Sequence, residues 1–444
     1  MSSTDQRLHE ALSAARDTKA LLIERGAIRQ APAVFAAHLP AAPALIVSDA
    51  TEFDVAGRDV LDALRCAGHR CHEPLIFDDA DLHAEHHYAE TIEQKLAAGD
   101  AMPIAVGAGT VNDLVKLAAD RARRPYMVVA TAASMDGYTA FGASITHMGI
   151  KQTFDCPAPR AVVADLDVIA AAPPSLNAAG YADLLAKLTA GADWIIADEL
   201  GVERIDPVAW RMVQEPLRQW LRDPAGIRRG DTAAVQRLIE GLMISGFAMQ
   251  LTETSRPASG AEHQFSHLWD MQHHTHDGRT PSHGFKVGIA TLAVAELIER
   301  LLEMPLETLN VSAAAARWPD EATEAAQIRD MFDIEVLREK ALEESGAKRI
   351  DAYELRGHLE LIRARWPRLR QRLRQHLPPA GELKQLLSAA GAPVEPEQIG
   401  ITRDRLRHSF RLAYHIRRRY TALDLAMRAG VLDAALDEML PGGA

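Results

Sequence analysis

The chain has 444 residues, of which 48% are hydrophobic and 25% charged, the balance of a globular protein large enough for two or three domains. Its formal net charge of −12 disfavours broad binding to nucleic acid or to an anionic membrane, so an anionic substrate requires a local basic pocket. No run approaches the about 18 apolar residues of a membrane span, and no signal peptide is expected. Three cysteines without a C-x-x-C pair predict free thiols in a reducing cytoplasm.

Strand and helix patterns alternate through the first part of the chain. An amphipathic helix is expected first, then strands and helices in turn, at 5–25 (helix), 43–50 (strand), 55–68 (helix), 71–77 (strand), 87–99 (helix), 102–109 (strand), 111–122 (helix), 126–133 (strand), 143–154 (hairpin turning at Met148 and Gly149) and 160–169 (strand). This alternation is typical of βαβ units around a parallel sheet. We therefore predict an α/β nucleotide-binding domain over residues 1–170.

Helical periodicity dominates from residue 173 onward, with wide apolar faces at 233–251 and 285–303. An all-helical domain is therefore predicted over 171–444. Arginines crowd two of its helices, at 363–378 and 403–420. Because leucines recur between them at helical spacing, we interpret these arginines as the solvated outer faces of packed helices, paired with acidic residues, rather than as a nucleic-acid surface.

A glycine-rich turn joins a strand to a helix in "VGAGTVNDLVK" (106–116). Gly107 and Gly109 allow the backbone to approach a diphosphate, and the following helix offers its amides. The third glycine of G-x-G-x-x-G is missing, so a nucleotide site and an ordinary turn both remain open.

Polar side chains follow two of the predicted strands. In "ATAASMDGYTAFGASI", Thr131 and Ser134 can bond a cofactor and Asp136 can hold a hydroxyl, at the edge of a parallel sheet where ligands bind. Asp49 ends the strand "PALIVSD", where a carboxylate can accept bonds from an adenine ribose and repel a 2′-phosphate. An exposed turn aspartate is the alternative for Asp49.

Candidate metal ligands occur in the helical part. Asp183 and Lys187 are four residues apart in "YADLLAK", which fits an exposed ion pair, although the apolar setting suits an inward-facing carboxylate. His263 and His267 have the same spacing, and His283 precedes an apolar helix. By spacing alone, a metal site and a histidine cluster without metal both remain open. The polar loop nearby adds His273, His274 and His276.

The sequence resembles the sn-glycerol-1-phosphate dehydrogenases, a branch of the superfamily that includes dehydroquinate synthase, glycerol dehydrogenase and iron-containing alcohol dehydrogenases. The resemblance runs from about residue 40 to 430. It is carried by "GAGTVNDLVK", "ATAASMDGYTAFGA", "AVVADLDVI", "AAGYADLLAKLTAGADW", "SRPASGAEHQFSH", "HGFKVGIAT" and "HIRRRYTALDLA".

The resemblance implies a dehydroquinate-synthase-like fold and a set of site residues. Asp183, His263 and His283 would hold one divalent metal ion, with His267 and Asp136 touching the substrate, so that residues 171–444 form the metal- and substrate-binding domain. The residues implied to line NAD(P)H are Gly107, Ala108, Gly109, Thr110, Val111, Thr131, Ala132, Ala133 and Ser134. Ala140 departs from the serine or threonine usual in related sequences, which implies one cofactor hydrogen bond fewer.

The implied reaction is the reversible reduction of dihydroxyacetone phosphate to sn-glycerol 1-phosphate, with the metal as Lewis acid. Lys187, Arg256 and Ser259 are candidate donors to the phosphate; an ion pair and a surface charge are the alternatives for the two cations. Zinc, nickel and iron all suit the ligand set. A homo-oligomer, a dimer or larger, and a role in phospholipid metabolism are expected. The alternative functions are a polyol dehydrogenase, a dehydroquinate-synthase-like cyclase and a binding protein without activity.

Overall fold

The computed structural model describes residues 3–79 and 82–441. Its internal contacts divide the chain into two compact units. Unit 1 comprises Met1–Leu184, Val208–Pro257 and Ala389–Gly391, and unit 2 comprises Leu185–Pro207, Ala258–Ser388 and Ala392–Ala444. The assignment of cofactor binding to residues 1–170 and of metal and substrate binding to 171–444 stays a prediction.

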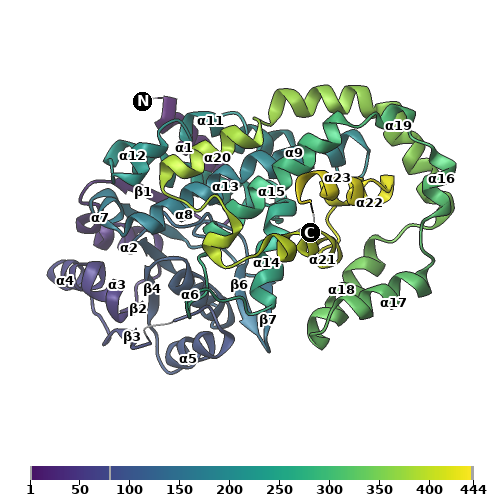
Figure 1. The fold of residues 1–444 in the computed structure, drawn as a ribbon. Coiled ribbons are helices and arrows are strands. Elements are labelled where there is room, and N and C mark those ends of the chain that lie inside the picture. Colours follow the sequence, from purple (N-terminus) through teal and green to yellow (C-terminus); the bar gives the residue numbers. More distant parts are fainter. Residues whose placement is uncertain (1–2, 80–81, 442–444) are drawn as a thin grey trace. The chain divides into compact units, whose positions relative to one another are not determined.

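Unit 1 is built on a six-stranded sheet whose neighbouring strands are all parallel (Figure 1). In spatial order the strands are β1 (Ala20–Glu24), β8 (Ala161–Asp165), β5 (Met127–Ala130), β4 (Met102–Gly107), β2 (Ala44–Asp49) and β3 (Leu75–Phe77). Gly107 pairs with Ala130, and Val47 of β2 pairs with Ala105 of β4. The predicted nucleotide turns therefore leave the same edge of the sheet, at the carboxyl ends of its strands.

Helices and a hairpin complete the α/β part of unit 1. They are α1 (Ser3–Ala14), η1 (Ala27–Gln30), α2 (Ala31–His38), α3 (Ala50–Glu52), the π-helical turn η2 (Phe53–Gly57), α4 (Arg58–Cys66), α5 (His86–Ala97), α6 (Gly109–Arg121), β6 (Ala143–His147), β7 (Ile150–Phe154) and α7 (Leu166–Ala171). Val60 and Leu64 of α4 share one hydrophobic core with Ile46, Ile104 and Val106 of the sheet. Burial by helices explains why the central strands are almost wholly apolar.

Two local predictions have different outcomes. The hairpin turn at Met148 and Gly149 is confirmed: φ is 52° at Met148 and 79° at Gly149, as a tight hairpin turn requires. The helix predicted over 5–25 is wrong beyond Ala14, because Ala20–Glu24 is an edge strand paired along its length with β8. Strand pairing there overrides a helical periodicity that the local sequence alone suggests.

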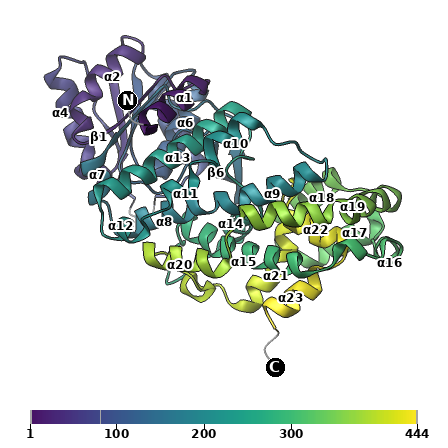
Figure 2. The same cartoon turned by 90° about the horizontal axis from the view of Figure 1, so that it is seen from above.

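The rest of the chain is helical, as predicted. Its elements are α8 (Pro174–Leu185), α9 (Lys187–Glu199), α10 (Pro207–Val213), α11 (Leu217–Trp220), α12 (Pro224–Arg228), α13 (Thr232–Thr252), α14 (Ala261–Met271), α15 (His283–Glu303), η3 (Leu306–Thr308), α16 (Val311–Ala316), α17 (Glu321–Met331), α18 (Glu335–Lys348), α19 (Ala352–His376), α20 (Ala380–Ala390), η4 (Pro396–Ile399), α21 (Arg403–His415), α22 (Ala422–Ala429) and α23 (Leu432–Met439). Within unit 2, α14 packs against α15 and α21, and α19 packs against α9 (Figure 2). None of the described helices has the length and apolar character needed to cross a membrane.

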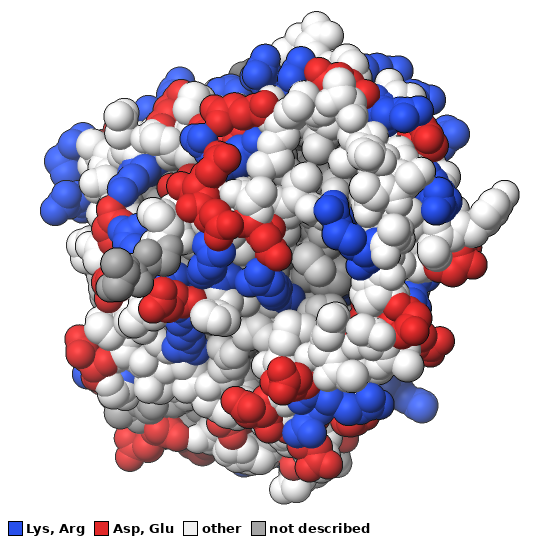
Figure 3. Space-filling model, turned by 45° about the vertical axis from the view of Figure 1, so that its right-hand side comes forward, with Lys and Arg blue, Asp and Glu red and all other residues white. Residues whose placement is uncertain are grey.

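The prediction that the arginines of 363–378 and 403–420 are solvated and paired with acidic residues holds for several of them. It is wrong for Arg405 and Arg417, which lie against His274 and His267. Glu199 accepts ion pairs from three arginines of α19, Arg365, Arg368 and Arg372. In α21, Arg411 pairs with Asp433. The face drawn in Figure 3 likewise intersperses basic and acidic side chains rather than gathering one sign into a broad field.

Candidate metal and nicotinamide site

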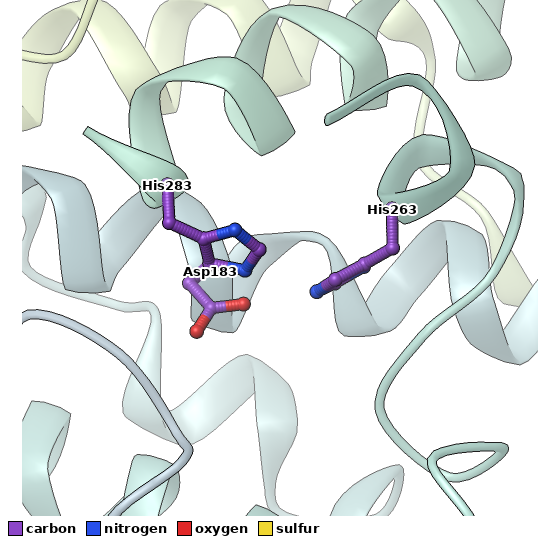
Figure 4. A group of neighbouring side chains, drawn as sticks. All are labelled: Asp183, His263 and His283. Carbon is purple, nitrogen blue, oxygen red and sulfur yellow. The ribbon is translucent and has the colours of Figure 1, made fainter. Parts of the chain in front are cut away.

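Three side chains distant in sequence converge on one point. Asp183 in α8, His263 in α14 and His283 at the first position of α15 each offer one ligand atom, and these atoms lie within 4.8 Å of one another (Figure 4). Asp183 is fully buried and His263 is 6% exposed. Ser282 caps α15, because its hydroxyl accepts a hydrogen bond from the Phe285 amide. This cap fixes the start of the helix and with it the backbone position of His283. A carboxylate with two imidazoles is a donor set that suits zinc, nickel or iron.

The histidines of this cluster are held by neighbouring polar groups. The Glu262 carboxylate lies 2.7 Å from His263 Nδ1, so Nε2 is the nitrogen oriented for a metal. Glu262 is fully buried and also accepts bonds from the Gly260 amide (2.6 Å) and the Thr189 hydroxyl (2.9 Å). Sequence analysis missed Glu262; its only signal is a carboxylate directly before a candidate ligand.

Asp136 and Asp183 are linked through the backbone. The Asp136 amide donates to Asp183 Oδ2 at 3.0 Å, and Ser245 Oγ lies 3.2 Å from Asp136 Oδ2. A Cβ on Gly180 would lie 1.8 Å from the carbonyl oxygen of Ala133, so only glycine lets α8 approach the 131–134 turn this closely. The predicted cofactor turn, the predicted substrate contact Asp136 and the predicted ligand Asp183 are thus in one packed arrangement.

An acidic side chain fills the glycine-rich turn. Glu52 Oε1 accepts bonds from the Ala108 amide at 2.7 Å and from the Thr131 hydroxyl at 3.1 Å. A Cβ on Gly107 would lie 2.1 Å from Glu52 Oε2. The turn therefore does present donors to a carboxyl oxygen, and Glu52 provides that oxygen here. Thr110 and Val111, also predicted to contact the cofactor, lie in the first turn of α6 behind Gly109.

Burial is the main reason why the pKa of Glu52 rises to about 8, and the nearby charge of Asp49 raises it further. Asp49 itself caps α3, its Oδ1 accepting the Glu52 amide at 2.8 Å. Asp49 therefore has a structural role as a helix cap, in addition to the contact with the cofactor ribose that the sequence predicts. Sequence analysis missed Glu52, because its contacts lie more than fifty residues away in the chain.

A buried lysine fixes the loop that follows the cofactor turn. Lys116 Nζ donates to the carbonyl oxygens of Gly137 (2.8 Å), Ala140 (3.0 Å) and Gly142 (3.0 Å). Ala140, for which the resemblance implies one cofactor hydrogen bond fewer, is buried there. Ala132 and Ala133 are buried in the preceding turn, and the Ala133 amide donates to Asn177 at 3.2 Å.

The predicted substrate-binding residues are placed differently from one another. His267 lies on α14 one turn after His263, and its Nδ1 is 3.4 Å from Arg417 Nη2, an arginine that sequence analysis did not single out. Lys187 and Arg256 are fully buried, so Arg256 is not the surface charge considered as its alternative, and Lys187 is not part of an exposed ion pair.

The loop histidines lie outside that cluster. His274 is buried, with Nε2 2.6 Å from the Ile399 carbonyl and Nδ1 2.7 Å from Arg405, so it has a structural role. His273 is exposed and has a positive φ of 52°. Among the described residues, the metal-ligating group contains neither of them, nor His276.

A family model and solved structures identify the fold. Residues 22–173 match the family model described as iron-containing alcohol dehydrogenase. Two solved structures share the fold: glycerol dehydrogenase from Schizosaccharomyces pombe (TM-score 0.59, 15% identity, 96% of this chain and 92% of that one) and a probable glycerol dehydrogenase from Sinorhizobium meliloti (TM-score 0.60, 16% identity, 96% and 98%). The predicted fold class is confirmed.

Proteins that are similar in sequence identify the family more narrowly than the fold does. Proteins named glycerol-1-phosphate dehydrogenase (NAD(P)+) are 35% identical in Halalkalibacterium halodurans (60% of this chain, 67% of the relative), 30% in Geobacillus thermodenitrificans (85% of each) and 31% in Bacillus subtilis (85% and 84%). The chain belongs to the glycerol-1-phosphate dehydrogenase family. The resemblance stated from the motifs is thereby confirmed.

Proposed function

We propose that this protein is an NAD(P)-dependent glycerol-1-phosphate dehydrogenase, which reduces dihydroxyacetone phosphate reversibly to sn-glycerol 1-phosphate. One hydride and one proton are added to the ketone, and NAD(P)H becomes NAD(P)+. The observation that carries the proposal is the Asp183, His263 and His283 cluster in a chain of this family. A bound divalent ion would supply Lewis-acid polarisation of the ketone, and a bound nicotinamide would supply the hydride.

The chain's own residues would bind and orient these groups. Asp183, His263 and His283 are the proposed metal ligands, with Glu262 holding the His263 ring. Asp136 and His267 are the proposed substrate contacts. The residues proposed to line the dinucleotide are Gly107, Ala108, Gly109, Thr110, Val111, Thr131, Ala132, Ala133 and Ser134, with Asp49 at the adenine ribose. Ser245 keeps the Asp136 carboxylate in place through its 3.2 Å contact.

Several finer assignments belong to the same proposal. The metal is zinc, nickel or iron; the protein acts in the cytoplasm as a homo-oligomer, and its product enters phospholipid metabolism. Lys187 and Arg256 remain proposed donors to the substrate phosphate.

Steady-state oxidation of NADH, with dihydroxyacetone phosphate and dihydroxyacetone as paired substrates, tests the proposal. We expect the phosphorylated ketone to have the higher kcat/KM by at least about tenfold, the effect of one charge-assisted hydrogen bond. Equal use of both ketones would favour a polyol dehydrogenase instead. Phosphate release without net NADH oxidation would favour a cyclase, and cofactor binding without turnover a binding protein.

A further inference from the structure

Three consecutive arginines follow α21, and their surroundings differ. Arg418 is exposed and pairs with Glu344 at 2.9 Å and with Glu343 at 3.2 Å. Arg419 Nη1 donates to the carbonyl oxygen of Ser259 at 2.6 Å. Arg417 has a different environment: its Nη2 lies 3.4 Å from His267 Nδ1.

Arg417 is partly buried. Burial lowers the pKa of its guanidinium, and the charge of Glu344 offsets only part of that effect. In the part of the chain that the structure describes, no carboxylate pairs with Arg417, because Glu344 is bound to Arg418 and Lys340 instead. A partly buried guanidinium without a carboxylate is a favourable place for an anion to bind.

The position of Arg417 indicates which anion that is. Its neighbour His267 has its ring centroid 6.3 Å from that of His283, and the His283 ring is 5.3 Å from that of His263. The His267 ring thus lies between Arg417 and the proposed metal ligand His283. Arg419, two residues on, holds the Ser259 backbone at the start of α14, so the segment carrying Arg417 is fixed to the helix that carries His263 and His267.

We propose that Arg417 binds the phosphoryl group of the substrate and thereby selects a phosphorylated ketone. The inference rests on the proposed function and adds to it a residue that the motifs did not single out. The planar guanidinium matches two phosphate oxygens in a bidentate arrangement, which an ammonium group does not. A substrate held by its carbonyl end at the metal ligands and by its phosphate at Arg417 would pass His267.

The test compares Arg417→Gln and Arg417→Lys with Arg418→Gln, a matched variant of the exposed neighbour. We expect Arg417→Gln to lower kcat/KM for dihydroxyacetone phosphate about 10- to 150-fold, chiefly through KM, and to leave dihydroxyacetone nearly unchanged. Arg417→Lys retains the charge and should fall between Arg417→Gln and wild type. Arg418→Gln should stay within about twofold of wild type on both ketones.

A binding measurement separates recognition from folding. Inorganic phosphate should raise the melting temperature of the wild type and of Arg418→Gln by similar amounts, and that of Arg417→Gln by clearly less. Equal losses on both ketones in Arg417→Gln, or an undiminished response to phosphate, would overturn the assignment of Arg417. If the wild type instead uses both ketones equally, the proposed function fails and the inference fails with it. A preference for the phosphorylated ketone that is as large in Arg417→Gln as in the wild type removes the inference alone.

Discussion

Glu52 in the glycine-rich turn and Glu262 beside the histidine cluster have opposite pKa shifts. Burial raises the pKa of both carboxyls. At Glu52 the charge of Asp49 adds to that effect, and the pKa reaches about 8. At Glu262 the hydrogen bond and charge of His263, together with the Gly260 amide, outweigh burial and lower the pKa. Neighbouring groups therefore decide which acid is charged: the turn holds a neutral acid near pH 7, and the cluster holds a carboxylate.

The largest effect on activity is expected from the histidine that Glu262 holds, because it is a proposed metal ligand. His263→Ala removes a proposed ligand, and we expect the purified variant to lose its metal and at least about a thousandfold in turnover. His273→Ala is the matched control, since His273 is exposed and outside the cluster, and it should keep both. Elemental analysis and steady-state kinetics measure the two quantities. Full wild-type turnover after exhaustive chelation would contradict metal dependence.

A smaller effect on metal binding is expected from Glu262, which contacts a proposed ligand but is not one itself. Glu262→Gln keeps the shape but removes the charge that holds His263 Nδ1, so metal affinity should fall about 10- to 100-fold. Thr189→Val removes only one other bond to Glu262 and should weaken binding less. Competition against a chromophoric chelator measures both. An unchanged affinity in Glu262→Gln would show that the carboxylate does not orient the ligand.

These two acids also show where sequence reasoning stops. The strands were predictable because the strands of a sheet buried on both faces consist mostly of apolar residues. The hairpin was predictable because Met148-Gly149 is a turn sequence. Asp183 and His263 are eighty residues apart, so no periodicity links them, and only the family resemblance grouped them. The contacts of Glu52 with Ala108 and Thr131 depend on strand order, which local sequence does not contain.

The acid in the turn predicts a pH dependence of cofactor binding. Below about pH 8 Glu52 is neutral and can donate to a phosphate oxygen; above that pH it ionises and repels the diphosphate. NADH affinity should therefore weaken as pH rises through 8, by at most about tenfold per pH unit. Asp49 and Tyr138 are the other titratable groups coupled to Glu52. Glu52→Gln should bind NADH with little change between pH 7 and 9.

Titration of NADH fluorescence at several pH values makes the measurement, with Glu90→Gln as an exposed control on α5. Parallel pH profiles for wild type and Glu52→Gln would show that Glu52 does not act on the cofactor. If neither protein binds NADH at any pH, the proposed cofactor turn itself is wrong.

The smallest expected effect concerns coenzyme choice. Asp49 ends β2, where a carboxylate can accept ribose hydroxyls and repel a 2′-phosphate. We therefore predict that NADH is used at least as well as NADPH. Asp49→Asn keeps a capping side chain for α3, so the fold should survive while the NADPH to NADH ratio of kcat/KM rises about 3- to 10-fold. Asp54→Asn, which breaks an exposed ion pair with Arg58 four residues on, is the matched control and should leave the ratio unchanged. A strong NADPH preference in the wild-type protein would show that Asp49 does not select the coenzyme, and that its contact with the Glu52 amide is its main role.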